Sequence, residues 1–151
     1  MRRRVVGPVR RLDLALVVAA ALGLLAASSG SAAPRPDQCL PYEPEVVSLV
    51  GTLQRHTFPG RPNYESVKRG DEAETGFYLH LDRPVCTVGT DEDSSWGHYR
   101  VDGAKVVQLV LDAAGYDRLR PRLGHRVTLR GTLFAAFTAH HHARLLLKVV
   151  P

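Results

Sequence analysis

The chain contains few of the residues that build redox, nucleotide or catalytic sites. It has 2 cysteines, and these form no Cys-x-x-Cys pair, which argues against thiol-redox chemistry. Its glycines form no G-x-x-x-x-G-K-[ST] loop of the kind that cradles nucleotide phosphates. No Ser-His-Asp or Cys-His arrangement can be assembled from spacing alone. The sequence therefore carries no enzyme signature, and it favours a role other than catalysis.

The chain also lacks an apolar run long enough to cross a membrane. The longest run, residues 14–27, would reach about 21 Å as a helix, short of the roughly 30 Å hydrocarbon core. It follows a basic stretch and precedes small residues, which is the order of a cleaved secretory signal. We predict a signal peptide at residues 1–32, a secreted or periplasmic location, and no stable membrane span after cleavage.

Positive charge is concentrated in this leader. The full chain has 20 Lys and Arg against 15 Asp and Glu, a formal net charge of +5. Cleavage would remove five Arg and one Asp, which leaves a net charge of about +1. A nearly neutral exported chain argues against nucleic acid as a partner.

The two cysteines predict a single disulfide, Cys39–Cys86, because an exported chain meets an oxidising compartment. In the chain-entropy model, closing a loop of this length stabilises the fold by about 4 kcal/mol. We expect a Pro-rich, extended lead-in at residues 33–44. Residues 45–151 are then long enough for one domain with a modest core.

A seven-residue pattern occurs twice in this domain. V-S-L-V-G-T-L at residues 47–53 returns as V-T-L-R-G-T-L at residues 127–133. The alternation predicts a strand with its Val and Leu side chains on one face. The glycine in mid-strand indicates a sharp bend or a barrel corner. We interpret the two copies as bent strands that lie side by side in a small barrel.

The remaining pattern predicts three more strands and a short helix. We expect strands at about residues 45–54, 75–84, 104–112, 125–137 and 143–150, and one or two helical turns within residues 113–123. This is the element order of the OB-fold. The predicted fold is all-β, a five-stranded OB-like β-barrel with its helix between strands 3 and 4. An SH3-like barrel is the main alternative, and it would not need the helical segment.

Three consecutive histidines are the clearest candidate for metal chemistry. In an extended segment His140 and His142 point the same way, so both could bind one Zn²⁺ or Cu²⁺ ion. Candidate additional ligands are His141, His80, Glu74 and His56. The alternative is a solvated turn whose imidazoles form local hydrogen bonds. No cofactor is required by the sequence, and Zn or Cu is the candidate.

A long connection at residues 55–74 is a candidate binding loop, because it mixes rings, carboxylates and turn residues. Its candidate ligand-binding residues are Asn63, Tyr64, Glu65, Asp71 and Glu74. A second candidate surface is the basic outer face of the last two strands, where Arg130 and Arg144 could meet an anionic ligand. For both surfaces the alternative is an ordinary solvated set of charges.

Several separated motifs resemble one family. They are P-N-Y-E-S-V at residues 62–67, G-D-E at 70–72, G-T-L-F at 131–134, H-H-H at 140–142 and L-L-L at 145–147. Together they resemble DUF4431, a family of small exported bacterial domains without an assigned function. The resemblance covers about residues 39–149 and implies an exported OB-like domain, with no catalytic residue to carry over. The motif positions that it marks as a candidate site are Asn63, Tyr64, Glu65, Asp71, Glu74, His140, His141 and His142.

We therefore predict a small exported binding module that recognises a protein or glycan partner through loops at the barrel edge. Two other hypotheses remain open. One is a Zn- or Cu-binding domain that uses His140 and His142. The other is a hydrolase that uses Glu65, Asp71 or Glu74.

Overall fold

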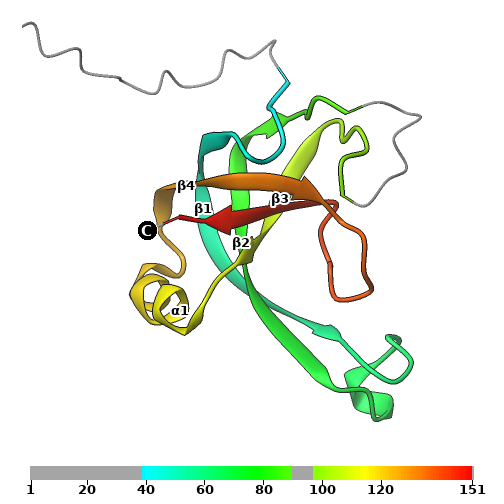
Figure 1. Ribbon diagram of the computed structural model, residues 1–151. Coiled ribbons are helices and arrows are strands. Elements are labelled where there is room, and N and C mark those ends of the chain that lie inside the picture. Colours follow the sequence, from blue (N-terminus) through cyan, green and yellow to red (C-terminus); the bar gives the residue numbers. More distant parts are fainter. Residues whose placement is uncertain (1–38, 90–96, 151) are drawn as a thin grey trace, which may run out of the picture. The chain divides into compact units, whose positions relative to one another are not determined.

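The computed structural model describes residues 39–89 and 97–150, so the predicted signal peptide at residues 1–32 and most of the predicted lead-in lie outside the described residues. The elements are β1 (Val46–Pro59), η1 (Val67–Arg69), β2 (Ala73–Val85), β3 (Ala104–Val110), α1 (Ala113–Leu119), η2 (Arg120–Arg122), β4 (Arg126–Ala135) and β5 (Leu145–Val149). The strands close into a barrel in the order β1-β2-β3-β5-β4 (Figure 1). β3 and β5 pair in parallel, and the other neighbours are antiparallel. The predicted all-β class and OB-like barrel, with the helix between strands 3 and 4, are confirmed.

The two copies of the repeated pattern lie side by side as predicted. β1 and β4 pair antiparallel with Leu49 opposite Leu129, and both side chains are buried in the barrel. Each glycine of the pattern therefore pairs with a valine of the other copy, as Gly51 does with Val127. The two copies therefore contribute matching apolar positions to one core, because side chains alternate between the two faces of each strand.

The mid-strand glycines are required by close packing of the backbone. A Cβ atom on Gly51 would collide with the carbonyl oxygen of His80 in β2. A Cβ atom on Gly131 would collide with the carbonyl oxygen of Lys148 in β5. At each of these glycines the neighbouring strand, β2 beside Gly51 and β5 beside Gly131, therefore approaches too closely for a side chain.

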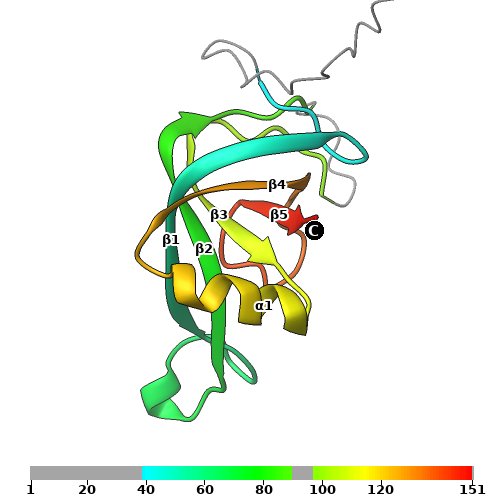
Figure 2. The same ribbon diagram turned by 90° about the vertical axis from the view of Figure 1, so that its left-hand side faces the viewer.

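Helix α1 lies across one end of the barrel (Figure 2). Its Asp112 N-cap accepts a hydrogen bond from the Gly115 N–H at 2.7 Å, and Leu119 is buried in the core. The regular helix ends at Leu119 and Pro121 falls in the following η2 turn, so the helical turns lie within the predicted residues 113–123. No helix among the described residues is long and apolar enough to cross a membrane.

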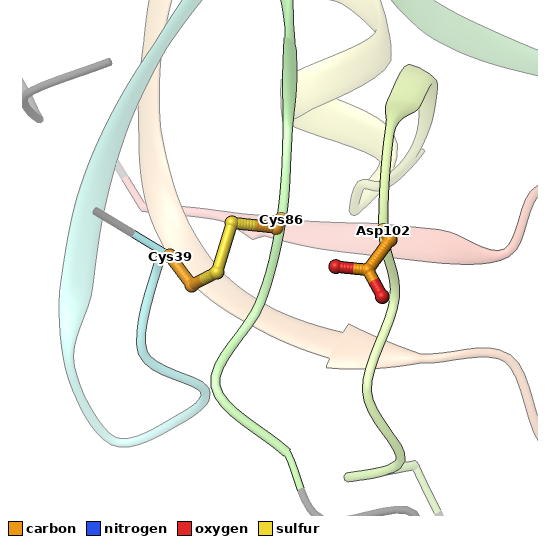
Figure 3. Close-up of side chains that lie close together, drawn as sticks. All are labelled: Cys39, Cys86 and Asp102. Carbon is orange, nitrogen blue, oxygen red and sulfur yellow. A yellow bond between two sulfur atoms is a disulfide. The ribbon is translucent and has the colours of Figure 1, made fainter. Parts of the chain in front are cut away.

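The predicted disulfide Cys39–Cys86 is present and ties the lead-in to the segment that follows β2 (Figure 3). Beside it, the Leu40 N–H donates to the Cys86 carbonyl at 2.7 Å, and the Val88 N–H donates to the Leu40 carbonyl at 2.8 Å. The lead-in is therefore held to the end of β2 by one covalent bond and two backbone hydrogen bonds.

The first two strands are longer than the sequence pattern predicts. β1 continues to Pro59 rather than to about residue 54, and β2 begins at Ala73 rather than at about residue 75. This added length is part of a two-stranded arm, residues 54–59 and 73–78, that extends away from the barrel (Figure 1). Part of the predicted 55–74 loop is therefore strand, and the connection itself is residues 60–72.

Candidate functional site

The carboxylate of Glu74, on the arm, contacts two histidines from the segment that precedes β5. We call that segment the histidine loop (residues 136–144). His140 Nδ1 lies 2.6 Å from Glu74 Oε1, and His142 Nε2 lies 2.7 Å from Oε2. The His142 side chain is 13% exposed and that of Glu74 22%. The two imidazoles that were predicted to point the same way therefore contact one carboxylate. Glu74 precedes both histidines by more than sixty positions in the sequence.

The electrostatics of Glu74 follow from this contact. Burial alone would raise the pKa of its carboxyl. Hydrogen bonds from His142 and His140, together with their charges, outweigh that effect and lower the pKa. The ionised carboxylate is therefore the favoured partner of the two rings.

His141 points to the other side of the histidine loop. Its ring packs edge-on against Phe137 and Phe134, with centroids 4.7 and 5.6 Å apart. Its Nδ1 accepts a hydrogen bond from the Phe137 N–H at 3.1 Å. Burial, followed by the charges of the neighbouring histidines, lowers the pKa of His141. This ring packs the loop and takes no part in the Glu74 contact.

Gln108 of β3 fixes the backbone of the histidine loop, and sequence reasoning missed it. Its Nε2 donates to the His140 carbonyl at 3.1 Å, and its Oε1 accepts from the His142 N–H at 2.7 Å. One amide thus holds the loop on either side of His141. The available signal was a polar residue in a strand whose other residues, apart from Lys105, are apolar, but that signal names no partner.

Asp71 organises the loop that connects the two strands of the arm. Its carboxylate accepts hydrogen bonds from the backbone N–H groups of Asn63, Glu65 and Ser66 and from the Asn63 side chain, at 2.7 to 3.2 Å. The residue is buried, at 5% exposure. The Ser66 hydrogen bond is the largest cause that lowers its pKa. Asn63 and Asp71, two of the candidate ligand-binding residues, therefore shape the loop.

This loop presents Tyr64 to the histidine loop. Tyr64 has φ 58°, a left-handed conformation that is uncommon for residues other than glycine. Its hydroxyl lies 3.4 Å from His140 Nε2, and the two rings meet edge to face. The neighbouring candidate Glu65 pairs with Arg69 at 3.0 Å on the exposed side of the loop. Of these two candidates, Tyr64 is the one that the fold brings to the histidines.

A pocket of about 430 Å³ lies where the arm meets the histidine loop and the start of β3. Its lining residues are His56, Phe58, Tyr78, His80, Asp102, Gly103, Ala104, Lys105, Val106, His142, Ala143 and Arg144. The ring of Phe58 stacks on that of His142, with centroids 4.5 Å apart and planes 7° apart. Tyr78 is buried, and burial, with smaller effects from Tyr116 and Glu74, raises its pKa to about 12. The pocket therefore has an aromatic and imidazole wall in which the Tyr78 phenol stays neutral.

Two histidines in this pocket form a pair of their own. His56 Nε2 and His80 Nε2 lie 2.8 Å apart. Burial, followed by the charge of His56, lowers the pKa of His80. His80 was considered above as a further ligand of a metal ion bound by His140 and His142. In the structure its hydrogen-bonding neighbour is His56.

Of the Lys, Arg, Asp and Glu residues that line the pocket, two are basic and one is acidic. Asp102 pairs through both carboxylate oxygens with Arg100 at 3.0 Å, and that contact lowers its pKa. Lys105 and Arg144 also line the pocket. By contrast, Arg130 is exposed on β4 opposite Ser48 of β1 and does not line it. The two basic candidates of the sequence analysis are therefore separated by the fold.

The described residues hold one group of three side chains close enough to share a metal ion, namely Cys39, Cys86 and Asp102. Figure 3 shows the two sulfurs bonded to each other, so they are not available as thiolate ligands. His140 and His142 meet a carboxylate, but within the described part of the chain they do not form a three-donor group of this kind.

Residues 106–150 match the model of the DUF4431 family, which is described as a domain of unknown function. The matched stretch runs from within β3 to just past β5 and includes the histidine loop. It confirms the resemblance for this part of the chain. Comparisons with curated proteins and with solved structures find no match.

Proposed function

We propose that the protein is a small exported binding module that holds an acidic oligosaccharide in the pocket between the arm and the histidine loop. One observation carries the proposal. Lys105 and Arg144 line a concave pocket, and neither forms an ion pair within residues 39–89 and 97–150. Asp102, the carboxylate among the lining residues, is already paired with Arg100. The excess of positive charge favours an anionic ligand.

The shape of the pocket favours a glycan chain over a folded protein. Its volume of about 430 Å³ falls within the usual range for ligand pockets, roughly 300–1,000 Å³. Protein partners usually need a broad contact surface of about 800 Å² on each side. Phe58 and the imidazoles supply ring faces and edges against which sugar C–H groups can pack. Export is supported by the disulfide, which is typical of oxidising compartments.

The test is calorimetric titration of the untagged protein at low salt with an oligogalacturonate and with a neutral oligosaccharide of equal length. We expect binding of the acidic chain that weakens as salt is added, because dissolved ions shorten the range of exposed charges to a Debye length of about 10 Å at 0.1 M. The Lys105→Ala and Arg144→Ala double variant should bind at least about tenfold more weakly, as two charge-assisted contacts are lost.

Arg130→Ala is the matched control, since it removes an exposed arginine that lies outside the pocket. Affinity should be unchanged in this control. Equal loss in the control and in the double variant would point to diffuse attraction and overturn the proposed pocket. Equal affinity for the acidic and the neutral chain would overturn the charge argument.

A further inference from the structure

The pair formed by His56 of β1 and His80 of β2 has a geometry that the Glu74 contact does not explain. In the β1–β2 register His56 lies opposite Gly76, and His80 lies opposite Thr52. Gly76 and His80 are four positions apart on β2 and so share a face, and His56 lies opposite Gly76 on β1, so both rings are on the outer face of the β1–β2 pair. They lean toward each other along this face until their Nε2 atoms are 2.8 Å apart.

Other side chains support the pair from below and beside it. The ring of Tyr78 meets that of His56 edge-on, with centroids 5.3 Å apart. Gly76 has no side chain opposite His56, and Tyr78 occupies the space above it, where a Cβ atom would lie 3.3 Å from the ring. The two imidazoles thus stand on rigid paired strands over a buried ring and line an open pocket.

We propose that the facing Nε2 atoms of His56 and His80 bind a copper ion. Two imidazole nitrogens at 2.8 Å can share one proton, with one ring as donor and the other as acceptor. Replacing that proton by a metal ion turns both nitrogens into ligands. With metal–nitrogen bonds of about 2 Å, the two atoms would separate to roughly 3.3–4 Å, which small rotations of the two side chains can supply.

Two ligands favour copper over zinc. Structural zinc sites use four protein ligands and catalytic sites use three. Among the residues that the structure describes, no third His, Cys, Asp or Glu donor forms a coordinating group with this pair. Monovalent copper is stable with two imidazoles in line, and divalent copper binds nitrogen ligands more strongly than the other first-row divalent ions do. Water or a bound anionic ligand can fill the open side of a divalent ion.

The site is distinct from the Glu74 contact and does not depend on the proposed glycan. Glu74 contacts ring nitrogens of His140 and His142, whereas the copper ligands come from β1 and β2 alone. The two functions can therefore fail separately. The Lys105→Ala and Arg144→Ala double variant should keep its copper affinity.

The test is anaerobic titration of the untagged protein with monovalent copper against a chromogenic chelator. We expect one equivalent bound more tightly than about 1 μM. His56→Gln and His80→Gln should each weaken binding at least 100-fold. His125→Gln is the matched control, since this exposed histidine lies in the turn before β4, and it should bind as the parent does. His140→Gln should also bind normally.

A second measurement needs no variant. Divalent copper added to the parent protein should broaden the NMR signals of His56, Gly76 and His80 before those of the histidine loop. Absence of stoichiometric copper binding in the parent would overturn the proposal. So would retention of affinity in both the His56→Gln and the His80→Gln variant, or broadening that begins at His140 and His142.

Discussion

The ring of His142 stacks on the ring of Phe58, with centroids 4.5 Å apart and planes inclined by 7°. This contact joins the histidine loop to the arm, two segments far apart in the sequence. The Glu74 carboxylate adds two polar contacts between the same segments. Since the pocket is lined by both segments, its shape depends on this docking.

Replacing Glu74 should loosen the histidine loop. Glu74→Gln removes the charge that both imidazoles contact, and a hydrogen bond to a charged group contributes about 1.5–3 kcal/mol. We expect hydrogen exchange at the His141 and His142 amides to become at least about tenfold faster. Glu72→Gln, at an exposed residue whose contact with Arg61 is 3.8 Å long, is the matched control. Equal exchange in both variants would contradict the docking role of Glu74.

The mid-strand glycines should tolerate no side chain. Gly51→Ala and Gly131→Ala each place a methyl group against a strand carbonyl, so the backbone must shift. We expect each to lower the free energy of unfolding by about 2 kcal/mol or more. Ser48→Ala, in the same strand as Gly51, should change the free energy of unfolding by less than about 0.5 kcal/mol. Urea denaturation measures the difference, and parent-like stability of the glycine variants would show that the strands can separate without cost.

Loss of the disulfide should destabilise the barrel mainly by freeing the unfolded chain. The bridge closes a loop with a sequence separation of 47. The chain-entropy model gives about 4 kcal/mol for a loop of this length. The Cys39→Ala and Cys86→Ala double variant should therefore show a clearly lower urea midpoint than the oxidised parent. An unchanged midpoint would mean that the lead-in hydrogen bonds beside Leu40 suffice to hold this end of the chain.

Acid should release the loop at residues 63–66. The pKa of Asp71 is lowered below its ordinary value of 3.8, with the Ser66 hydrogen bond as the largest cause. The stabilisation is therefore fully present above pH 3.8 and is lost as the pH falls through the lowered pKa. NMR should show the Glu65 and Ser66 amide shifts titrating below pH 3.8. Asp71→Asn should abolish this titration, and an Asp71 pKa at or above the ordinary value would contradict the assignment.

Much of the fold could be predicted from local patterns. The two V-[ST]-L-x-G-T-L segments indicate bent strands because alternation and a mid-strand glycine are properties of the strand itself. The disulfide follows from the cysteine count, and the helix end is fixed near Pro121. The arm was missed because its residues are polar and aromatic in a mixture that also suits a loop.

The candidate site was predictable only as a set of residues. The sequence places His140 and His142 on one side of an extended segment, and it marks Glu74 and Tyr64 as polar residues of a long connection. It offers Glu74 as one of several possible partners of these histidines and does not choose among them. Signal cleavage after residue 32 and the secreted or periplasmic location stay predictions.

The sequence by itself therefore determined the order of strands and helix along the chain, the faces that enter the core and the disulfide, since each depends on interactions within a segment or on residue identity. Only the tertiary structure decided that Glu74 contacts two histidines, that His56 faces His80, and that Arg144 reaches the pocket while Arg130 does not. These pairings depend on how far the arm extends and where the histidine loop docks. One strand pattern is compatible with many such arrangements, and packing between distant segments selects among them.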